Sequence, residues 1–308
     1  MSSGNRPSHL AAIGIALFVT VLWSSSWVLI RWGLDSEGLK PITFAALRYG
    51  LAAVLVVGWM FLRERPQRQL RRMDRPMILQ VVALGVLMYA VTQGALFVAL
   101  DNQPAATTSL VLSLTPLLVA GFAVITLAEI PSSRQIVGAV LVTMGAWLYF
   151  AGDLGATVAG MVAALVGLGA NVSAALLGRH VNRQAQLSPI VVTALSMAVG
   201  AALLVVVGIA IEGIPTVSIQ AWLIIAWLAA VNTAVAFTLW NLSLRRLSAV
   251  ESAGINNTML IQIAVLAWVF LDETPGTAEL VGILLVSTGV FLTQAIRTNM
   301  KAAATSRP

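Results

Sequence analysis

Polar and aromatic side chains recur inside long apolar segments of this chain, where each is costly unless it faces water or another polar group. They form no nucleophile, acid–base pair or metal-ligand cluster, since the chain has no cysteine and its two histidines lie outside these segments. The pattern therefore predicts no catalytic residue, no metal and no cofactor, but reversible binding of a small molecule. The predicted substrate-binding residues are Trp23, Ser24, Trp27, Arg48, Tyr89, Gln93, Asn171, Thr233, Phe237, Asn241, Asn256 and Asn257.

Arg48 is the charge that bears most directly on substrate chemistry. It lies about two turns from the end of an apolar segment. Its side chain either extends to the membrane surface or faces a cavity as a fixed cation, where it could hold a carboxylate through two parallel hydrogen bonds. Glu251, near the end of another segment, either pairs with Arg245 or Arg246 or stabilises a helix start. Because no clear acid lies at depth, the sequence favours a facilitator or exchanger over a proton antiporter.

Membrane-spanning helices must position these residues. Hydrophobic residues make up 59% of the chain and charged residues 10%, far from the values of soluble proteins. The apolar runs lack the alternation of a membrane barrel, so an all-α integral membrane protein is expected. The ten predicted transmembrane spans are residues 10–30, 42–62, 77–100, 105–128, 135–150, 157–178, 189–211, 220–243, 249–271 and 278–296.

The chain contains an internal sequence repeat, with one copy in each half. The stretch LAEIPSSRQIVGAVLVTMG (Leu127–Gly145) returns in the second half as LDETPGTAELVGILLVSTG (Leu271–Gly289). Because five spans per copy is an odd number, the second copy must cross the membrane in the opposite sense, with a central cavity between the copies. We expect a single membrane domain over residues 1–308, with repeats at 10–150 and 157–296 and a cytoplasmic tail at 297–308.

Basic residues set the expected orientation and partners. With both termini cytoplasmic, fifteen of the 18 lysines and arginines fall on the inner side, as the positive-inside rule requires. Six of them form the cluster 63–75. That cluster favours contact with anionic membrane lipids over nucleic acid, which is not expected as a partner.

Glycine and proline predict how the helices pack and bend. Gly138 and Gly145 return as Gly282 and Gly289, small residues seven apart on one helix face. They fit close packing within the chain or a homodimer face, and a monomer is the first expectation. Pro116 should bend the span 105–128, and since its counterpart is Leu260, the second copy is expected to bend less.

Several motifs together resemble the EamA-type branch of the drug/metabolite transporter superfamily. They are LWSSSWVLIRWGL in the first span, RYGLAA in the second and TSLVLSLTPLL in the fourth, followed by a Glu-Pro turn and a Val-Gly-rich fifth span. The resemblance implies ten helices in two inverted five-helix repeats and export of small metabolites across the bacterial inner membrane. Arg48 and the aromatic residues are similar to those of amino-acid exporters, including exporters of aromatic amino acids. The second half departs from the pattern, with Ser196 where Arg48 would repeat.

The function predicted from the sequence is export of small metabolites, foremost aromatic and other neutral amino acids, by alternating access. The small-molecule substrate would lie between the halves. The alternatives are export of other solutes such as drugs or nucleobase-like metabolites, a channel-like facilitator, and a membrane subunit that transports nothing.

Overall fold

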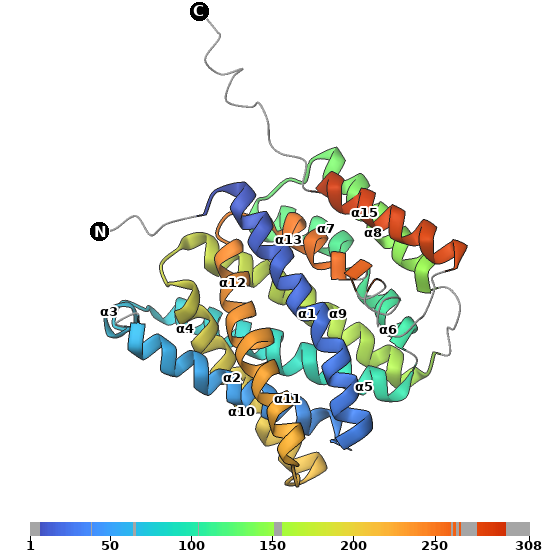
Figure 1. Cartoon of the computed structure of the whole chain (residues 1–308). Coiled ribbons are helices and arrows are strands. Elements are labelled where there is room, and N and C mark those ends of the chain that lie inside the picture. The colour runs from blue at the N-terminus through green and yellow to red at the C-terminus, as the bar shows by residue number, and fades with distance from the viewer. Residues whose placement is uncertain are drawn as a thin grey trace, which may run out of the picture.

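The computed structural model describes residues 7–37, 39–63, 66–103, 105–150, 156–259, 261–262, 265 and 276–293, and this part of the chain is helical without a strand (Figure 1). Two π-helical segments, η1 and η2, interrupt the α-helices. The elements are α1 (His9–Glu37), α2 (Pro41–Arg63), α3 (Gln67–Leu70), α4 (Arg75–Gly85), η1 (Val86–Val91), α5 (Thr92–Asn102), α6 (Ala105–Leu112), α7 (Thr115–Leu127), α8 (Ser133–Phe150), α9 (Val158–Gln184), α10 (Pro189–Glu212), α11 (Ile219–Ala229), η2 (Ala230–Val235), α12 (Ala236–Ser243), α13 (Ala249–Asn256) and α15 (Thr277–Thr293).

The outer surface of the helical body is apolar, as lipid contact requires. Seven of the described helical stretches are long and apolar enough to cross a membrane, and Leu280–Thr293 is a shorter apolar helix. Large side chains such as Leu62 and Ile125, both 82% exposed, point outward from it. The predicted span 249–271 lies partly outside the described residues, so the count of ten spans stays a prediction.

Glycines bring α8 and α15 into close antiparallel contact. A Cβ atom built on Gly145 would lie 2.6 Å from the carbonyl oxygen of Gly282, and one on Gly282 would lie 2.7 Å from that of Gly145. Gly138 and Gly289 face each other in the same reciprocal way. The glycine stripe predicted from the sequence therefore packs helix against helix within one chain, and these two repeat-related helices run in opposite directions.

Other repeat-related elements follow the same pattern. In α2 and α10, Gly50 faces Val205 and Gly208 faces Ala46, again an antiparallel pairing. The π-helical segment η1 begins at Val86, and η2 begins at Ala230. Val86 and Ala230 are separated by the same spacing as Leu127 and Leu271, which open the two repeated stretches. Both copies therefore carry the same local irregularity at the same place.

Both copies also interrupt their fourth helix. In the first copy α6 ends at Leu112 and α7 begins at Thr115, with Pro116 in its first turn. In the second copy α13 ends at Asn256, the repeat counterpart of Leu112. Leu260, the counterpart of Pro116, lies outside the described residues, so the expectation of unequal bending stays a prediction. The hydroxyls of Thr115 and Thr258 each donate a hydrogen bond to a carbonyl three residues earlier, which takes over part of the hydrogen bonding at the break.

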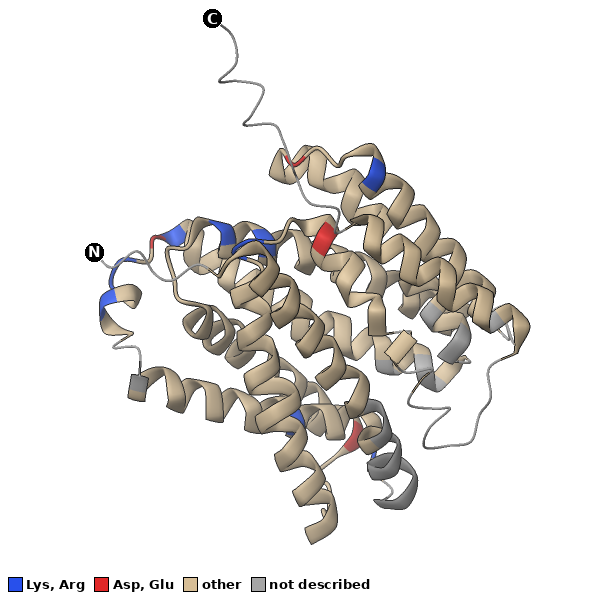
Figure 2. Ribbon diagram, turned by 45° about the horizontal axis from the view of Figure 1, so that its top comes forward, with Lys and Arg blue, Asp and Glu red and all other residues tan. Residues whose placement is uncertain are grey.

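Charge is concentrated at one edge of the helical body. Figure 2 shows most of the described arginines and lysines along this edge, while the middle of the body is nearly free of colour. The described part thus separates a charged rim from an apolar middle, the distribution that a bilayer imposes.

We expect Gly145→Ala to destabilise the protein by about 1–3 kcal/mol, because the added methyl group must push apart the backbones of α8 and α15. Gly58→Ala is the matched control, since a Cβ atom there meets nothing within 4 Å. Thermal unfolding of both purified variants in detergent measures the difference, and equal midpoints would contradict the close packing.

Candidate functional site

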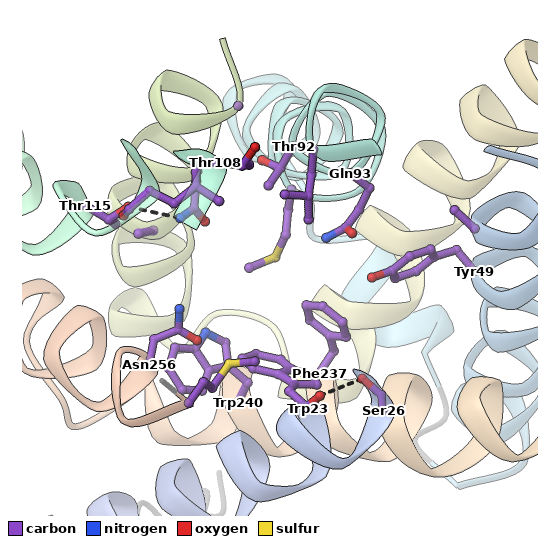
Figure 3. Close-up of a pocket in the computed structure, with 18 of the residues that line it drawn as sticks. Trp23, Ser26, Tyr49, Thr92, Gln93, Thr108, Thr115, Phe237, Trp240 and Asn256 are labelled. Carbon is purple, nitrogen blue, oxygen red and sulfur yellow. Dashed lines mark hydrogen bonds between the residues drawn. The ribbon is translucent and has the colours of Figure 1, made fainter. Parts of the chain in front are cut away.

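A cavity of about 660 Å³ lies between helices of both copies (Figure 3). Elements of the first copy (α1, α2, η1, α5, α6 and α7) and of the second (α9, α12 and α13) contribute to its wall. Its volume lies within the roughly 300–1,000 Å³ typical of small-molecule sites. Six of the residues predicted from the sequence line it: Trp23, Arg48, Gln93, Asn171, Phe237 and Asn256.

Arg48 is buried, only 8% exposed, and it borders the cavity. Its Nε donates a hydrogen bond of 2.8 Å to the hydroxyl of Thr233, and its Nη2 lies 3.5 Å from the carbonyl oxygen of Asn232. The guanidinium carbon also lies 5.3 Å from the ring centre of Tyr49. Among the described residues no carboxylate lies within ion-pair distance of Arg48. A cation with hydrogen-bonding capacity to spare is therefore available to an anionic group of a ligand.

The π-helical segment η2 positions this cation. Asn232 and Thr233 both belong to η2, and both are buried. The side-chain amide of Asn232 donates hydrogen bonds to the carbonyl of Leu22 and the hydroxyl of Ser25 in α1. The segment η2 thus contacts α1 through Asn232 and Arg48 of α2 through Thr233. Thr233 therefore holds Arg48 in place without lining the cavity itself.

Aromatic rings form one side of the cavity. The ring centre of Trp23 lies 4.9 Å from that of Phe237 and 5.1 Å from that of Trp240. Tyr49 continues this group, with its ring centre 6.3 Å from that of Phe237. Figure 3 shows Trp23, Phe237 and Trp240 together, across the open space from Thr92, Thr108 and Gln93. This side offers flat apolar contact area to a ligand.

Neutral polar groups form the opposite side and one end. The amide of Asn171 donates a hydrogen bond of 3.3 Å to the hydroxyl of Thr115. The amides of Gln93 and Asn256 border the cavity without a hydrogen bond to any described residue. Asn256 ends α13 and Thr115 begins α7, so both helix breaks supply polar groups to the wall. These groups can donate to and accept from a ligand without carrying charge.

Five predicted site residues do not line the cavity, and Trp27 has a side chain outside the described part. Thr233 supports Arg48, as described above. Ser24 bonds the carbonyl of Thr20 and the amide oxygen of Gln262, which turns it toward another helix. Asn241 bonds Thr193 and Asn182 in the buried interior. Asn257 follows α13 and bonds carbonyls of that helix through its backbone N–H.

Tyr89 lies behind the aromatic side of the cavity and does not line it. It is fully buried, with its ring between those of Phe237, 5.0 Å away, and Tyr49, 5.8 Å away. A four-residue spacing predicts that Tyr89 and Gln93 share a helix face, but Tyr89 lies within η1, which has more residues per turn than an α-helix. Tyr89 therefore supports the aromatic side from behind, while Gln93 faces the cavity.

Sequence reasoning missed other lining residues, foremost Ser26, Tyr49, Thr92, Thr108, Thr115, Trp240 and Ser252. For some of them a signal was present. Tyr49 continues the face of Phe44, Ala45 and Arg48, and Thr108 and Thr115 lie seven residues apart, on one side of a continuous helix. Helical spacing from predicted site residues was a signal for others as well. Ser26 lies three residues after Trp23 in α1, and Trp240 lies three residues after Phe237 in α12.

Ion pairs of Glu129 lie next to the cavity wall, near Leu244. Glu129 accepts a hydrogen bond of 2.9 Å from Nε of Arg179, and its other oxygen accepts one of 3.1 Å from the backbone N–H of Ala249. Arg179 also donates to the carbonyl of Leu244, a residue of the cavity wall. A loop of the first copy is thereby fastened to two helical elements of the second.

A known family of proteins matches both copies of the repeat. The model of the EamA-like transporter family matches residues 10–151 and again residues 159–294. The chain belongs to the EamA-like transporter family. The protein is thus a multi-pass membrane protein, and the two matches divide it where the sequence repeat does.

Two individual proteins are similar over most of this EamA-family chain. One is a protein of Streptantibioticus cattleyicolor, named a probable terminal-alkyne amino-acid exporter. It is 27% identical over 290 residues, which cover 91% of this chain and 92% of the relative. The other is a crystal structure with a TM-score of 0.76 and 21% identity, covering 92% of this chain and 96% of the solved one. This second likeness shows that the fold is shared.

Water access separates residues of the cavity wall from residues of the interior. Because the chain has no cysteine, single cysteines can be labelled without background. We expect Gln93→Cys to react with a small water-soluble thiol reagent at least about tenfold faster than Asn241→Cys, since only the thiolate that water reaches reacts. Similar rates at both positions would contradict the placement of the cavity.

Proposed function

We propose that this EamA-family transporter exports amino acids, foremost neutral ones with apolar or aromatic side chains, by alternating access. The observation that carries the proposal is a cavity between the two copies that combines one fixed cation, an aromatic side and neutral amides. Its described lining contains no acid, which disfavours substrates with a net positive charge. The exporter named among the relatives supports the substrate class and the direction.

Each part of a neutral amino acid has a partner in this arrangement. The carboxylate would bind the free N–H groups of Arg48. The ammonium group would donate to the amide oxygens of Gln93 and Asn256, and it could also contact the face of Trp23 or Trp240. The side chain would lie against the aromatic side. Binding therefore requires both ends of the zwitterion and leaves the side chain to hydrophobic contact.

We further propose that ten spans form two inverted five-helix repeats, with the termini in the cytoplasm of a bacterial cell and the body in the inner membrane. The reciprocal glycine contacts of α8 and α15, and the equivalent positions of η1 and η2 in the two copies, support a twofold axis between the copies. The bonds of Glu129 to Arg179 and Ala249 would then close the cytoplasmic end. Alternating access requires these bonds to break when the substrate enters from inside.

Counterflow in liposomes tests the substrate class. We expect protein in liposomes loaded with phenylalanine to accumulate labelled phenylalanine and leucine with saturable kinetics. Phenethylamine, which lacks the carboxylate, should not be exchanged. Exchange of phenethylamine or of cationic drugs at equal rates would refute the proposal in favour of a drug exporter, and flux without saturation or counterflow would indicate a channel-like pore.

Arg48→Gln tests the role of the cation. We expect an apparent affinity for phenylalanine about 10- to 100-fold lower, because a charge-assisted pair with the carboxylate is lost. Thr233→Val should weaken binding in the same direction, since it removes the acceptor that orients Nε of Arg48. Thr233→Ser is the matched control, because it restores the hydroxyl and with it the affinity. Unchanged affinity in Arg48→Gln would show that the carboxylate binds elsewhere.

A further inference from the structure

A second cavity, of about 260 Å³, lies apart from the first and shares no lining residue with it. It lies between the segment of α3 and α4 in the first copy and the connection from α9 to α10 in the second. Its lining residues are Gln69, Arg72, Met73, Met77, Gln186 and Leu187. The proposed transport mechanism makes no use of this cavity.

The lining combines a cation and amides with an apolar floor. No described residue hydrogen-bonds to the guanidinium of Arg72, and this side chain is exposed. Met77 is only 3% exposed, and Leu187 only 5%. A guanidinium beside carboxamides is a donor set suited to phosphate, and buried thioether and leucine side chains suit the carbon chain of a phosphate ester. A ligand with a phosphate but no carbon chain, or with a carbon chain but no phosphate, would contact only part of the lining.

The surroundings of the cavity select the ligand further. Arg68, Arg71 and Arg75 are exposed close by in the sequence, and the charged edge shown in Figure 2 contains this region. In a membrane protein, such an edge lies at the level of the lipid headgroups, where anionic lipids are attracted to basic segments. The cavity therefore lies where a phosphate with an attached apolar chain is abundant.

We propose that this cavity binds the phosphate group of an anionic phospholipid, with Arg72 as its principal partner and Met73 and Met77 in contact with the adjoining apolar part. The ligand would lie across the junction of the two copies. There the backbone N–H of Ser188 donates a hydrogen bond of 2.8 Å to the amide oxygen of Gln69. The side chain of Arg245 donates one of 2.6 Å to the carbonyl of Leu187. Occupancy therefore stabilises contact between α3 and the start of α10.

Thermal unfolding in detergent tests the site without a transport assay, so its failure is distinguishable from failure of the transport proposal. Three probes are compared, namely short-chain phosphatidylglycerol, short-chain phosphatidylcholine and inorganic phosphate. We expect phosphatidylglycerol to raise the unfolding midpoint in a saturable way and phosphatidylcholine to have little effect. An equal rise with inorganic phosphate would assign the site to phosphate alone and overturn the lipid as its ligand, and no rise with any probe would overturn the site.

Two arginine variants distinguish a built site from general surface attraction. Arg72→Gln and Arg71→Gln remove the same charge at neighbouring exposed positions, but only Arg72 lines the cavity. We expect about tenfold weaker apparent affinity for phosphatidylglycerol in Arg72→Gln, as loss of a charge-assisted contact implies, and a change below about twofold in Arg71→Gln. Equal losses in both variants would overturn the proposal. Arg72→Lys keeps the charge without the planar fork and should give an intermediate affinity.

Discussion

The burial of one guanidinium within an apolar helical body is the constraint on which the central cavity depends. A buried charge is tolerated only when hydrogen bonds replace its water, and Arg48 obtains them from the hydroxyl of Thr233 and the carbonyl of Asn232. Both acceptors come from η2, whose wider turn sets them toward α2 while Asn232 also bonds α1. Arg48 also borders the cavity in which we place the substrate.

The two copies have equivalent helical elements, but the side chains at equivalent positions differ. Where Arg48 of α2 bonds η2, the counterpart Ser196 of α10 lies against Gly85, directly before η1. A Cβ atom on Gly85 would meet the carbonyl oxygen of Ser196 at 2.2 Å, so the backbone of α10 packs closely against the first copy at this point. At one of these two repeat-related positions the helices pack closely, and at the other a cation borders the cavity. This asymmetry fits the proposed binding of an anionic group at Arg48.

Much of the fold followed from periodicity, repeats and charge, and the site followed only in part. Apolar runs located the helices, and the spacing of Gly138 and Gly145 indicated a packing face that the structure places against α15. Arg48, Gln93 and Asn171 were predicted because a polar side chain inside a membrane span is costly unless it faces a cavity or another polar group. Tyr89 lies behind the cavity wall and not in it, because a π-helix has more residues per turn than an α-helix and so changes which side chains share a face.

The most direct test of the central claim places two equivalent residues on either side of the membrane. Ser132 and Gly276 occupy the same position in the two copies, directly before the repeat-related helices α8 and α15. The account predicts that Gly276→Cys reacts with a membrane-impermeant thiol reagent in intact cells, whereas Ser132→Cys reacts only after permeabilisation. Reaction of both cysteines from the same side would contradict antiparallel copies, and with them a cavity that opens alternately to the two faces.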